Sequence, residues 1–193
     1  MDTLILNNIA LHIAVDTPEA NYFLSLLEHK SIKRKEPLLR AGDTCRAINF
    51  VTKGCLRMYA AHENGKEHIL MFAPENWWCT DLFSFHANAP AAHSIDALED
   101  TEVLQLSSQN LERLYERVPK FERFFRVLFQ NGFIMFQNRI TTELALPAEQ
   151  KYERFKQLYP GLNQRVAQKY IAAYLGITPV FLSMLRKRAD GIY

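Results

Sequence analysis

The chain has 193 residues, of which 48% are apolar and 23% are charged. This composition suits one or two small domains with real hydrophobic cores, and it excludes disordered and collagen-like chains. No apolar run approaches the roughly 20 residues that a membrane span needs, and residues 1–15 lack the features of a secretory signal. The three cysteines, Cys45, Cys55 and Cys79, show no metal-ligand spacing and favour a reduced, cytosolic compartment.

The net charge of +2 is unevenly distributed along the chain. Residues 151–193 hold eight Lys or Arg and two Asp or Glu, whereas residues 1–150 hold fifteen and nineteen. A basic C-terminal segment joined to an acidic remainder is typical of a small nucleic-acid-binding module attached to a second domain.

The N-terminal part of the chain predicts one helix followed by many short strands. Residues 16–19 (DTPE) supply a capping residue, a proline and an acidic first turn, which together indicate a helix start. From Ser31 onward, β-rich runs alternate with turn signals, and further strands are expected at residues 94–98 and 102–106. Short strands at regular spacing favour a sandwich, barrel or jelly roll.

The clearest hairpin covers residues 56–72. Asn64-Gly65 at its tip supplies the two positive-φ residues of a tight turn. Leu56 and Met58 alternate with Arg57 and Tyr59, which is the period of a half-buried strand.

Helical periodicity returns after Ser107. Residues 108–117 predict a short amphipathic helix, and residues 120–146 predict one long helix with two apolar stripes. Since a helix on a single core needs only one stripe, we expect burial against both its own chain and a second copy of it. The alternative is a helix wrapped entirely by its own chain. The residues assigned to this dimer seam are Phe125, Leu128, Phe129, Gly132, Phe133 and Phe136.

Residues 168–188 predict a helix-turn-helix. Gly176 ends the first helix, because glycine adopts the positive φ of a C-cap. Thr178 is a good N-cap and Pro179 suits the first helical position, so a second helix starts at once. The small Ala172 lets the helices cross closely. A short turn with glycine and a basic second helix is the DNA-reading arrangement; a plain helical hairpin is the alternative.

In this order of elements, and most specifically in residues 170–188 (YIAAYLGITPVFLSMLRKR), the chain resembles the superfamily of the cyclic-AMP receptor protein and the fumarate–nitrate reductase regulator, Crp/Fnr. It looks like a compact, Bacteroidetes-type branch without a β-wing. The resemblance implies an α+β fold with three segments and a cytoplasmic homodimer. Its partners would be double-stranded DNA with a palindromic site and, as a further candidate, RNA polymerase. The segments are a cyclic-nucleotide-binding-like antiparallel β-roll (residues 1–118), a dimerisation helix (119–146) and a helix-turn-helix domain (147–193).

The resemblance does not imply cyclic AMP. Members that bind cyclic nucleotides have Gly-Glu and, about ten residues on, Arg-Ser or Arg-Thr; the arginine neutralises the phosphate and the glutamate takes the ribose hydroxyl. Here Thr80-Asp81 and Ala91-Ala92 stand at those positions. Because nothing replaces the arginine, we expect no cyclic nucleotide, and the sequence identifies no other cofactor.

The nature of any effector stays open at this point. The aromatic, weakly polar residues 77–86 either line a pocket for an apolar or neutral ligand or simply fill the roll. Three scattered cysteines do not provide the roughly four ligands of an iron–sulfur cluster. Haem through His86 or His93 is left open, although a lone histidine is usually polar surface. The effector-site candidates are Trp78, Thr80, Asp81, Leu82, Phe83, Ala91 and Ala92.

Base contacts of such regulators come from the N-terminal part of the second helix. Related regulators commonly place Arg and Glu there, and this chain has Pro179, Val180 and Met184, so bidentate readout is missing. Either specificity rests on thymine methyls, hydroxyls and DNA shape, or tight DNA binding has been lost. The predicted DNA-binding residues are Thr178, Pro179, Val180, Ser183, Met184, Arg186, Lys187, Arg188 and Lys169.

Three functions compete. The first is a dimeric transcription regulator gated by an unknown effector, and we predict this one. The second is a dimeric ligand- or protein-binding module that has lost tight DNA binding. The third is an enzyme, which we do not expect, because the sequence shows no catalytic triad, paired carboxylates or metal-ligand spacing.

Overall fold

The computed structural model describes residues 2–62 and 65–189, apart from the side chains of Asp2, Arg188 and Ala189. The chain forms two compact units. The first unit combines the residues before 62 with residues 70–130, and the second combines residues 62–69 with those after 130. The boundary falls inside the predicted long helix, so each unit contains one part of that helix.

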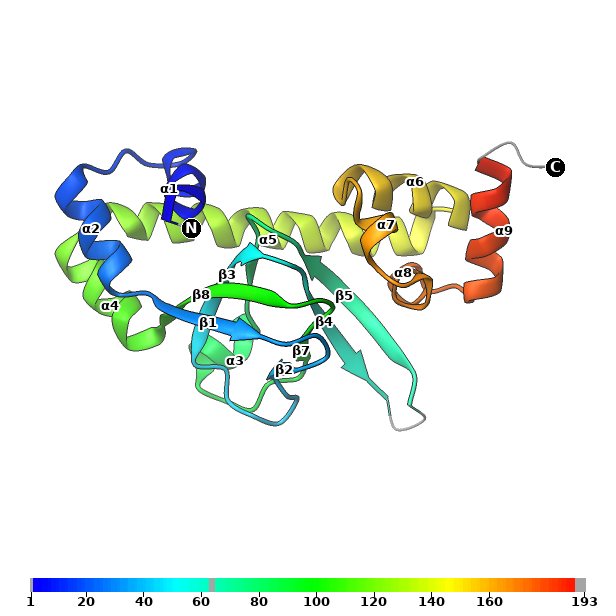
Figure 1. Ribbon diagram of the computed structural model, residues 1–193, viewed down its shortest axis with the longest axis horizontal. Helices are drawn as coiled ribbons and strands as arrows, with labels where there is room; N and C mark the ends of the chain where they lie inside the picture. The colour runs from blue at the N-terminus through cyan, green and yellow to red at the C-terminus, as the bar shows by residue number, and fades with distance from the viewer. Residues whose placement is uncertain (1, 63–64, 190–193) are drawn as a thin grey trace. The chain divides into compact units, whose positions relative to one another are not determined.

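The first unit is built on two four-stranded sheets (Figure 1), with strand orders β1-β8-β3-β6 and β2-β7-β4-β5. The registered pairs are antiparallel, as the predicted β-roll requires. The strands are β1 (Glu28–Ile32), β2 (Pro37–Leu39), β3 (Ala47–Lys53), β4 (Leu56–Ala61), β5 (Glu67–Ala73), β6 (Trp78–Cys79), β7 (Ser94–Ala97) and β8 (Thr101–Ser107).

The predicted hairpin corresponds to β4 and β5, which are neighbours in their sheet. Gly65 has the expected positive φ of 77°, and Asn64 lies outside the described residues. Although Arg57 alternates with apolar residues along β4, its side chain is only 5% exposed. Arg57 lies directly opposite Asp96 on β7, and its Nε and Nη2 donate to the two carboxylate oxygens at 2.7 and 2.8 Å. The paired carboxylate is what permits burial of the guanidinium.

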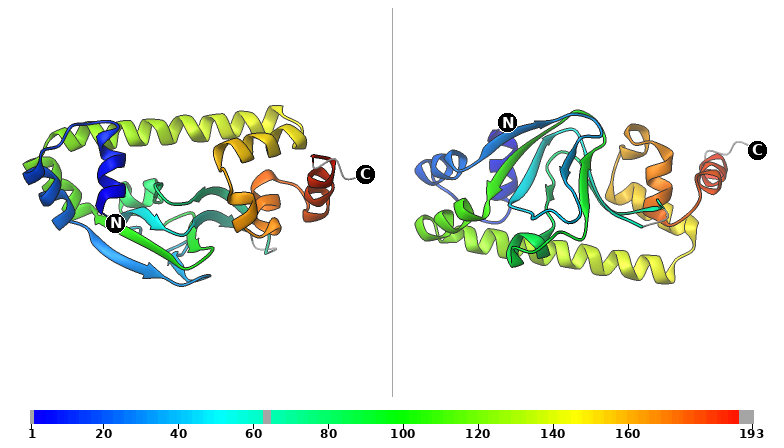
Figure 2. Two further views of the ribbon diagram at one scale, coloured as in Figure 1. Left: turned by 45° about the horizontal axis from the view of Figure 1, so that its top comes forward. Right: turned by 90° about the horizontal axis from the view of Figure 1, so that it is seen from below.

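Four helices belong to the first unit besides the start of the long helix: α1 (Asp2–Ala10), α2 (Thr17–Ser25), α3 (Leu82–Ala87) and α4 (Ser108–Arg117). The predicted start of α2 is confirmed by a complete capping box between Asp16 and Glu19. Helix α1 was not predicted, and it buries Ile5 and Ile9 completely. Figure 2 shows α1, α2 and α4 gathered around the first part of the long helix.

The long helix, α5, runs from Lys120 to Ala145, close to its predicted bounds. In the first unit its aromatic residues enter the core. Phe121 stacks on Phe23 with ring centroids 4.9 Å apart, and Phe124 and Phe125 contact the Trp78 ring at 5.9 and 5.7 Å. The first part of α5 is therefore held by its own chain.

The second unit contains the rest of α5 with α6 (Ala148–Leu158), α7 (Leu162–Arg165), α8 (Gln168–Leu175) and α9 (Pro179–Ala189). Its core is a cluster of aromatic rings, with Phe155 within 5.5 Å of both Tyr159 and Tyr174. The predicted helix-turn-helix is α8–α9. Gly176 ends α8 in the left-handed region with φ of 67°, and the Phe181 N–H donates to the Thr178 hydroxyl at 3.2 Å.

Candidate functional site

The outer side of α9 carries most of the predicted DNA-binding residues. Leu182 and Leu185 are buried and anchor the helix against α8, where Ala172 is also buried. Thr178, Pro179, Val180, Met184 and Lys187 are exposed, whereas Ser183 and Arg186 are half-buried. Lys169, at the start of α8, is exposed beside the Tyr170 ring. The side chain of Arg188 lies outside the described residues.

The exposed start of α9 is chemically unusual for a base-reading surface. Val180 and Met184 offer no hydrogen-bonding group, so direct contacts from this part of the helix are limited to apolar surface and the Thr178 and Ser183 hydroxyls. The cations Arg186 and Lys187 follow at the later part of the helix, where phosphate contacts are typical.

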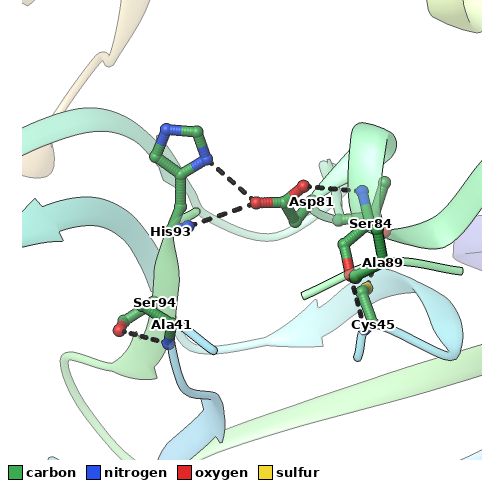
Figure 3. Close-up of polar contacts among 8 residues, drawn as sticks. Ala41, Cys45, Asp81, Ser84, Ala89, His93 and Ser94 are labelled. Carbon is green, nitrogen blue, oxygen red and sulfur yellow. Dashed lines mark hydrogen bonds and ion pairs between the residues drawn. The ribbon is translucent and has the colours of Figure 1, made fainter. Parts of the chain in front are cut away.

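The second candidate site is the segment between β6 and β7, shown in Figure 3. Asp81 is buried and caps α3: its Oδ1 accepts from the Ser84 N–H at 3.0 Å. Its Oδ2 lies 2.9 Å from His93 Nδ1 and accepts from the His93 N–H at 3.3 Å. The Ser84 hydroxyl donates to the Ala89 carbonyl and accepts from the Cys45 N–H at 2.8 Å. The protein's own carboxylate therefore accepts from the Ser84 N–H at the start of α3.

The charge state of Asp81 follows from these bonds. Burial alone would raise the pKa of the carboxyl group, but the hydrogen bonds from Ser84 and His93 outweigh burial, and the pKa is lowered. The sequence left haem binding through His93 open and did not pair His93 with Asp81. In the structure His93 contacts the Asp81 carboxylate directly.

We expect Asp81→Ala to lower the free energy of unfolding by about 1–3 kcal/mol at pH 7, since it removes a helix cap and a charged partner of His93. A carboxyl group with a lowered folded-state pKa stabilises above its unfolded pKa of about 3.9 and loses this effect as the pH falls through the folded value. Denaturant unfolding at pH 7 and below pH 4 should therefore show a difference between wild type and variant that shrinks in acid. The exposed Asp43→Ala is the control; an equal effect from it would contradict the assignment.

The other effector-site candidates differ in their surroundings. Trp78 packs its ring 5.0 Å from Phe50 and donates its indole N–H to Asn8. The Thr80 hydroxyl donates to the Ala47 carbonyl at 3.2 Å. Leu82, Phe83 and Ala92 are exposed, and Ala91 is buried. Of the two interpretations left open above, the contacts of Trp78 favour an aromatic residue that fills the roll, whereas Phe83 is exposed.

The predicted dimer-seam residues divide into two groups. Phe125 is 1% exposed in the core of the first unit, so its side chain is not available to a partner. Phe133 is 65% exposed, and two further apolar residues beyond the predicted set, Ile140 and Leu144, are 59% and 84% exposed. The remaining members, which are all partly exposed, are Leu128, Phe129, Gly132 and Phe136.

Arg139 on α5 has a structural role that the sequence did not reveal. Its Nη2 donates to the carbonyl oxygens of Ile69 on β5 and Tyr174 on α8 at 2.7 and 2.8 Å. Its guanidinium also lies 3.6 Å from the centroid of the Tyr174 ring. Within the second unit, this one side chain connects α5 to α8, the first helix of the helix-turn-helix.

The described residues offer little support for a nucleophilic or metal-dependent site. The cysteines are free and buried, and burial strongly raises the pKa of the Cys79 thiol, which disfavours the nucleophilic thiolate. Across residues 2–62 and 65–189, no group of three or more His, Cys, Asp or Glu side chains is placed to hold a metal ion. The helices in the same ranges are too short or too polar to span a membrane.

This chain, with its β-roll, long helix and helix-turn-helix, is similar to several known regulatory proteins. Residues 29–118 match the cyclic nucleotide-binding domain. The chain is 24% identical to regulatory protein HlyX of Actinobacillus pleuropneumoniae over 95% of this chain and 80% of that protein. It is also 24% identical to the fumarate and nitrate reduction regulatory protein of Vibrio cholerae, over 95% of this chain and 77% of the relative.

The structure of FixK2 from Bradyrhizobium japonicum superposes with a TM-score of 0.73 at 16% identity, covering 86% of each chain. Residues 29–118 therefore form a domain of the cyclic nucleotide-binding type, and the whole chain is similar to regulators of the Crp/Fnr family. The predicted fold class is confirmed, and the matched relatives are regulatory proteins, not enzymes. The assignment to the compact, wingless branch stays a prediction.

Proposed function

We propose that this protein is a cytoplasmic, homodimeric transcription regulator that binds double-stranded DNA by inserting α9 into the major groove. The observation that carries the proposal is the α8–α9 helix-turn-helix, with buried Leu182 and Leu185 on one side and exposed Val180, Met184 and Lys187 on the other. The regulatory relatives support it.

Dimerisation is supported by the exposed apolar side of α5. Phe133, Ile140 and Leu144 follow each other at spacings of seven and four, so they share one side of the helix. A two-fold dimer through this side would present two copies of α9 about 34 Å apart, which is one turn of DNA, and so favours a palindromic site. RNA polymerase remains a further candidate partner.

The sensor part of the proposal is a cyclic-nucleotide-type roll that lacks the residues needed to bind a cyclic nucleotide. A cyclic phosphate requires a cation and free N–H donors. Here Ala91 and Ala92 supply no charge, and Asp81 already accepts from the Ser84 and His93 N–H groups. An entering phosphate would have to displace a buried carboxylate of the same sign of charge.

The alternative is a dimeric ligand- or protein-binding module that no longer binds DNA tightly. It is favoured by Val180 and Met184, which replace hydrogen-bonding side chains with apolar ones at the exposed start of α9. Thymine-methyl contacts and DNA shape supply a reading mechanism that suits these residues, and the basic end of α9 is retained; for these reasons we prefer the regulator.

The proposal is tested by incubating the purified protein with fragmented genomic DNA of its host at near-physiological salt and sequencing the retained fragments. A regulator should enrich a two-fold-symmetric site. The enriched site then serves as the probe for Arg186→Ala with Lys187→Ala, which should weaken binding and lower the slope of log K against log salt by about 2, because each phosphate contact contributes about 0.9.

The matched control is Lys30→Ala with Arg123→Ala, which removes the same charge from exposed positions of the first unit. This control should leave both affinity and salt slope close to wild type. A folded wild-type protein that enriches no site would favour the binding-module alternative, and binding that is indifferent to the α9 double variant would refute the docking of α9.

A further inference from the structure

The second unit contains a cavity that none of the functions considered so far uses. It has a volume of about 600 Å³ and lies between the later part of α5 and helices α6 and α8, which Figure 2 shows side by side. Small-molecule sites typically measure about 300–1,000 Å³. The cavity is therefore large enough for a small organic ligand.

The wall of the cavity carries more positive than negative charge. Its cations are Arg139, Lys151 and Arg154, and its one carboxylate is Glu143. Lys151 neutralises Glu143 at an Nζ–Oε2 distance of 2.8 Å. The positive charges of Arg139 and Arg154 remain, because within the part of the chain that the structure describes neither arginine forms an ion pair with a carboxylate.

The two arginines are held in place by neutral partners. Arg154 donates to the Thr142 hydroxyl at 2.9 Å, and Arg139 donates to the carbonyls of Ile69 and Tyr174. The Nη1 of Arg139 is buried and has no hydrogen-bond partner among the described residues. A buried guanidinium nitrogen without an acceptor is costly. The charges of the two arginines, which no carboxylate among the described residues neutralises, make the cavity electrostatically suited to an anion.

The remaining wall is apolar. Ile134 on α5 and Leu158 on α6 are exposed at the cavity, and the buried Phe155 and Leu175 also line it. An arginine pair beside aliphatic and aromatic surface matches a ligand with one carboxylate and an apolar body. An inorganic ion would leave the apolar part of the wall in contact with water.

The cavity does not compete with the proposed dimer seam. Successive residues of an α-helix are about 100° apart around its axis, which puts the cavity residues Asn138 and Thr142 on nearly the opposite side of α5 from Ile140 and Leu144. A partner helix packed on the apolar side would therefore leave the cavity accessible.

We propose that this cavity binds a small organic carboxylate, with the carboxylate paired to Arg154 and Arg139 and the apolar body against Ile134 and Leu158. Because Arg139 also holds the Tyr174 carbonyl of α8, an occupied cavity would favour one placement of the helix-turn-helix relative to α5. Ligands bias a conformational equilibrium by this kind of differential contact. The binding site itself does not depend on the proposed DNA function.

The test is isothermal titration of the 193-residue chain, without DNA, with 4-phenylbutyrate and with its neutral amide. The acid should bind and the amide should bind at least about tenfold more weakly, since the charge-assisted bonds are lost. Arg154→Gln should reduce affinity for the acid about tenfold and leave affinity for the amide unchanged. Arg123→Gln, the same change at an exposed position of the first unit, is the control.

A second variant tests the cavity without changing Arg154, so that an indirect effect of Arg154→Gln can be recognised. Ile134→Glu, at a partly exposed position, places a carboxylate at the cavity and should abolish binding of the acid while the protein stays folded by circular dichroism. The proposal is overturned if the wild-type protein binds neither compound up to about 10 mM, or if the acid and the amide bind equally. Inorganic phosphate that binds as well as the acid, with the same dependence on Arg154, would overturn it too and assign these cations to DNA backbone contacts.

Discussion

Replacing Arg57 by alanine is expected to lower the free energy of unfolding by about 3–5 kcal/mol, because it leaves the buried Asp96 carboxylate without its partner. The two side chains face each other across neighbouring strands β4 and β7 and form two hydrogen bonds at 2.7 and 2.8 Å. The Arg57 guanidinium also lies 4.1 Å from the centroid of the Tyr59 ring. Truncation therefore removes a charge pair and a packed contact in the centre of the sheet.

The measurement is guanidinium unfolding followed by tryptophan fluorescence. Both tryptophans, Trp77 and Trp78, belong to the first unit, so the signal reports on the roll that contains the pair. The control is the double variant Arg57→Met with Asp96→Leu, which replaces the pair by apolar side chains of similar size. It should recover most of the lost stability, since such exchanges of a buried pair are often neutral. A loss below about 1 kcal/mol for the single variant would contradict a structural role for the pair.

The features that the sequence predicted well are those that depend on neighbouring residues. The capping box of Asp16 and Glu19, the left-handed Gly176 and the Thr178 cap are all set within four residues of chain. The order of roll, long helix and helix-turn-helix follows from such local signals, and the fold class was therefore predictable before any tertiary contact was known.

The contacts that the sequence did not predict join residues far apart in the chain. Arg57 and Asp96 are 39 residues apart, and they meet because of strand register. Arg139 reaches carbonyls 70 and 35 residues away. His93 and Asp81 meet because α3 and the following turn fold back on each other. Periodicity indicates which face of an element is buried, but it does not identify the side chain on the opposing element.

The long helix shows the same limit at single residues. Phe125 and Phe133 belong to one helical stripe, and the stripe alone assigns them the same role. In the structure Phe125 enters the core of the roll, with Trp78 and Phe124 around it, whereas Phe133 is exposed. The difference arises because the aromatic core of the first unit covers only the first part of α5.

The exposed part of this stripe is the basis of a second prediction with a large expected effect, this time on dimerisation. We expect Phe133→Glu to weaken dimerisation by about a hundredfold or more, because a two-fold seam contains the substitution twice and each buried phenylalanine contributes about 1.5–3 kcal/mol. Since Phe133 is 65% exposed in the single chain, the substitution should not unfold the protomer. Sedimentation velocity over a range of concentrations measures the dissociation constant, and circular dichroism checks the fold.

Asn138→Glu is the matched control, because it adds the same charge to an exposed position on nearly the opposite side of α5. It should leave the dimer intact. If the seam is correct, Phe133→Glu should also lose affinity for a palindromic site while it retains weak, salt-sensitive binding to a half-site, since each protomer keeps an intact α9. A dimer of unchanged affinity in Phe133→Glu would show that the partner binds elsewhere, and the exposed apolar side of α5 would then need another occupant.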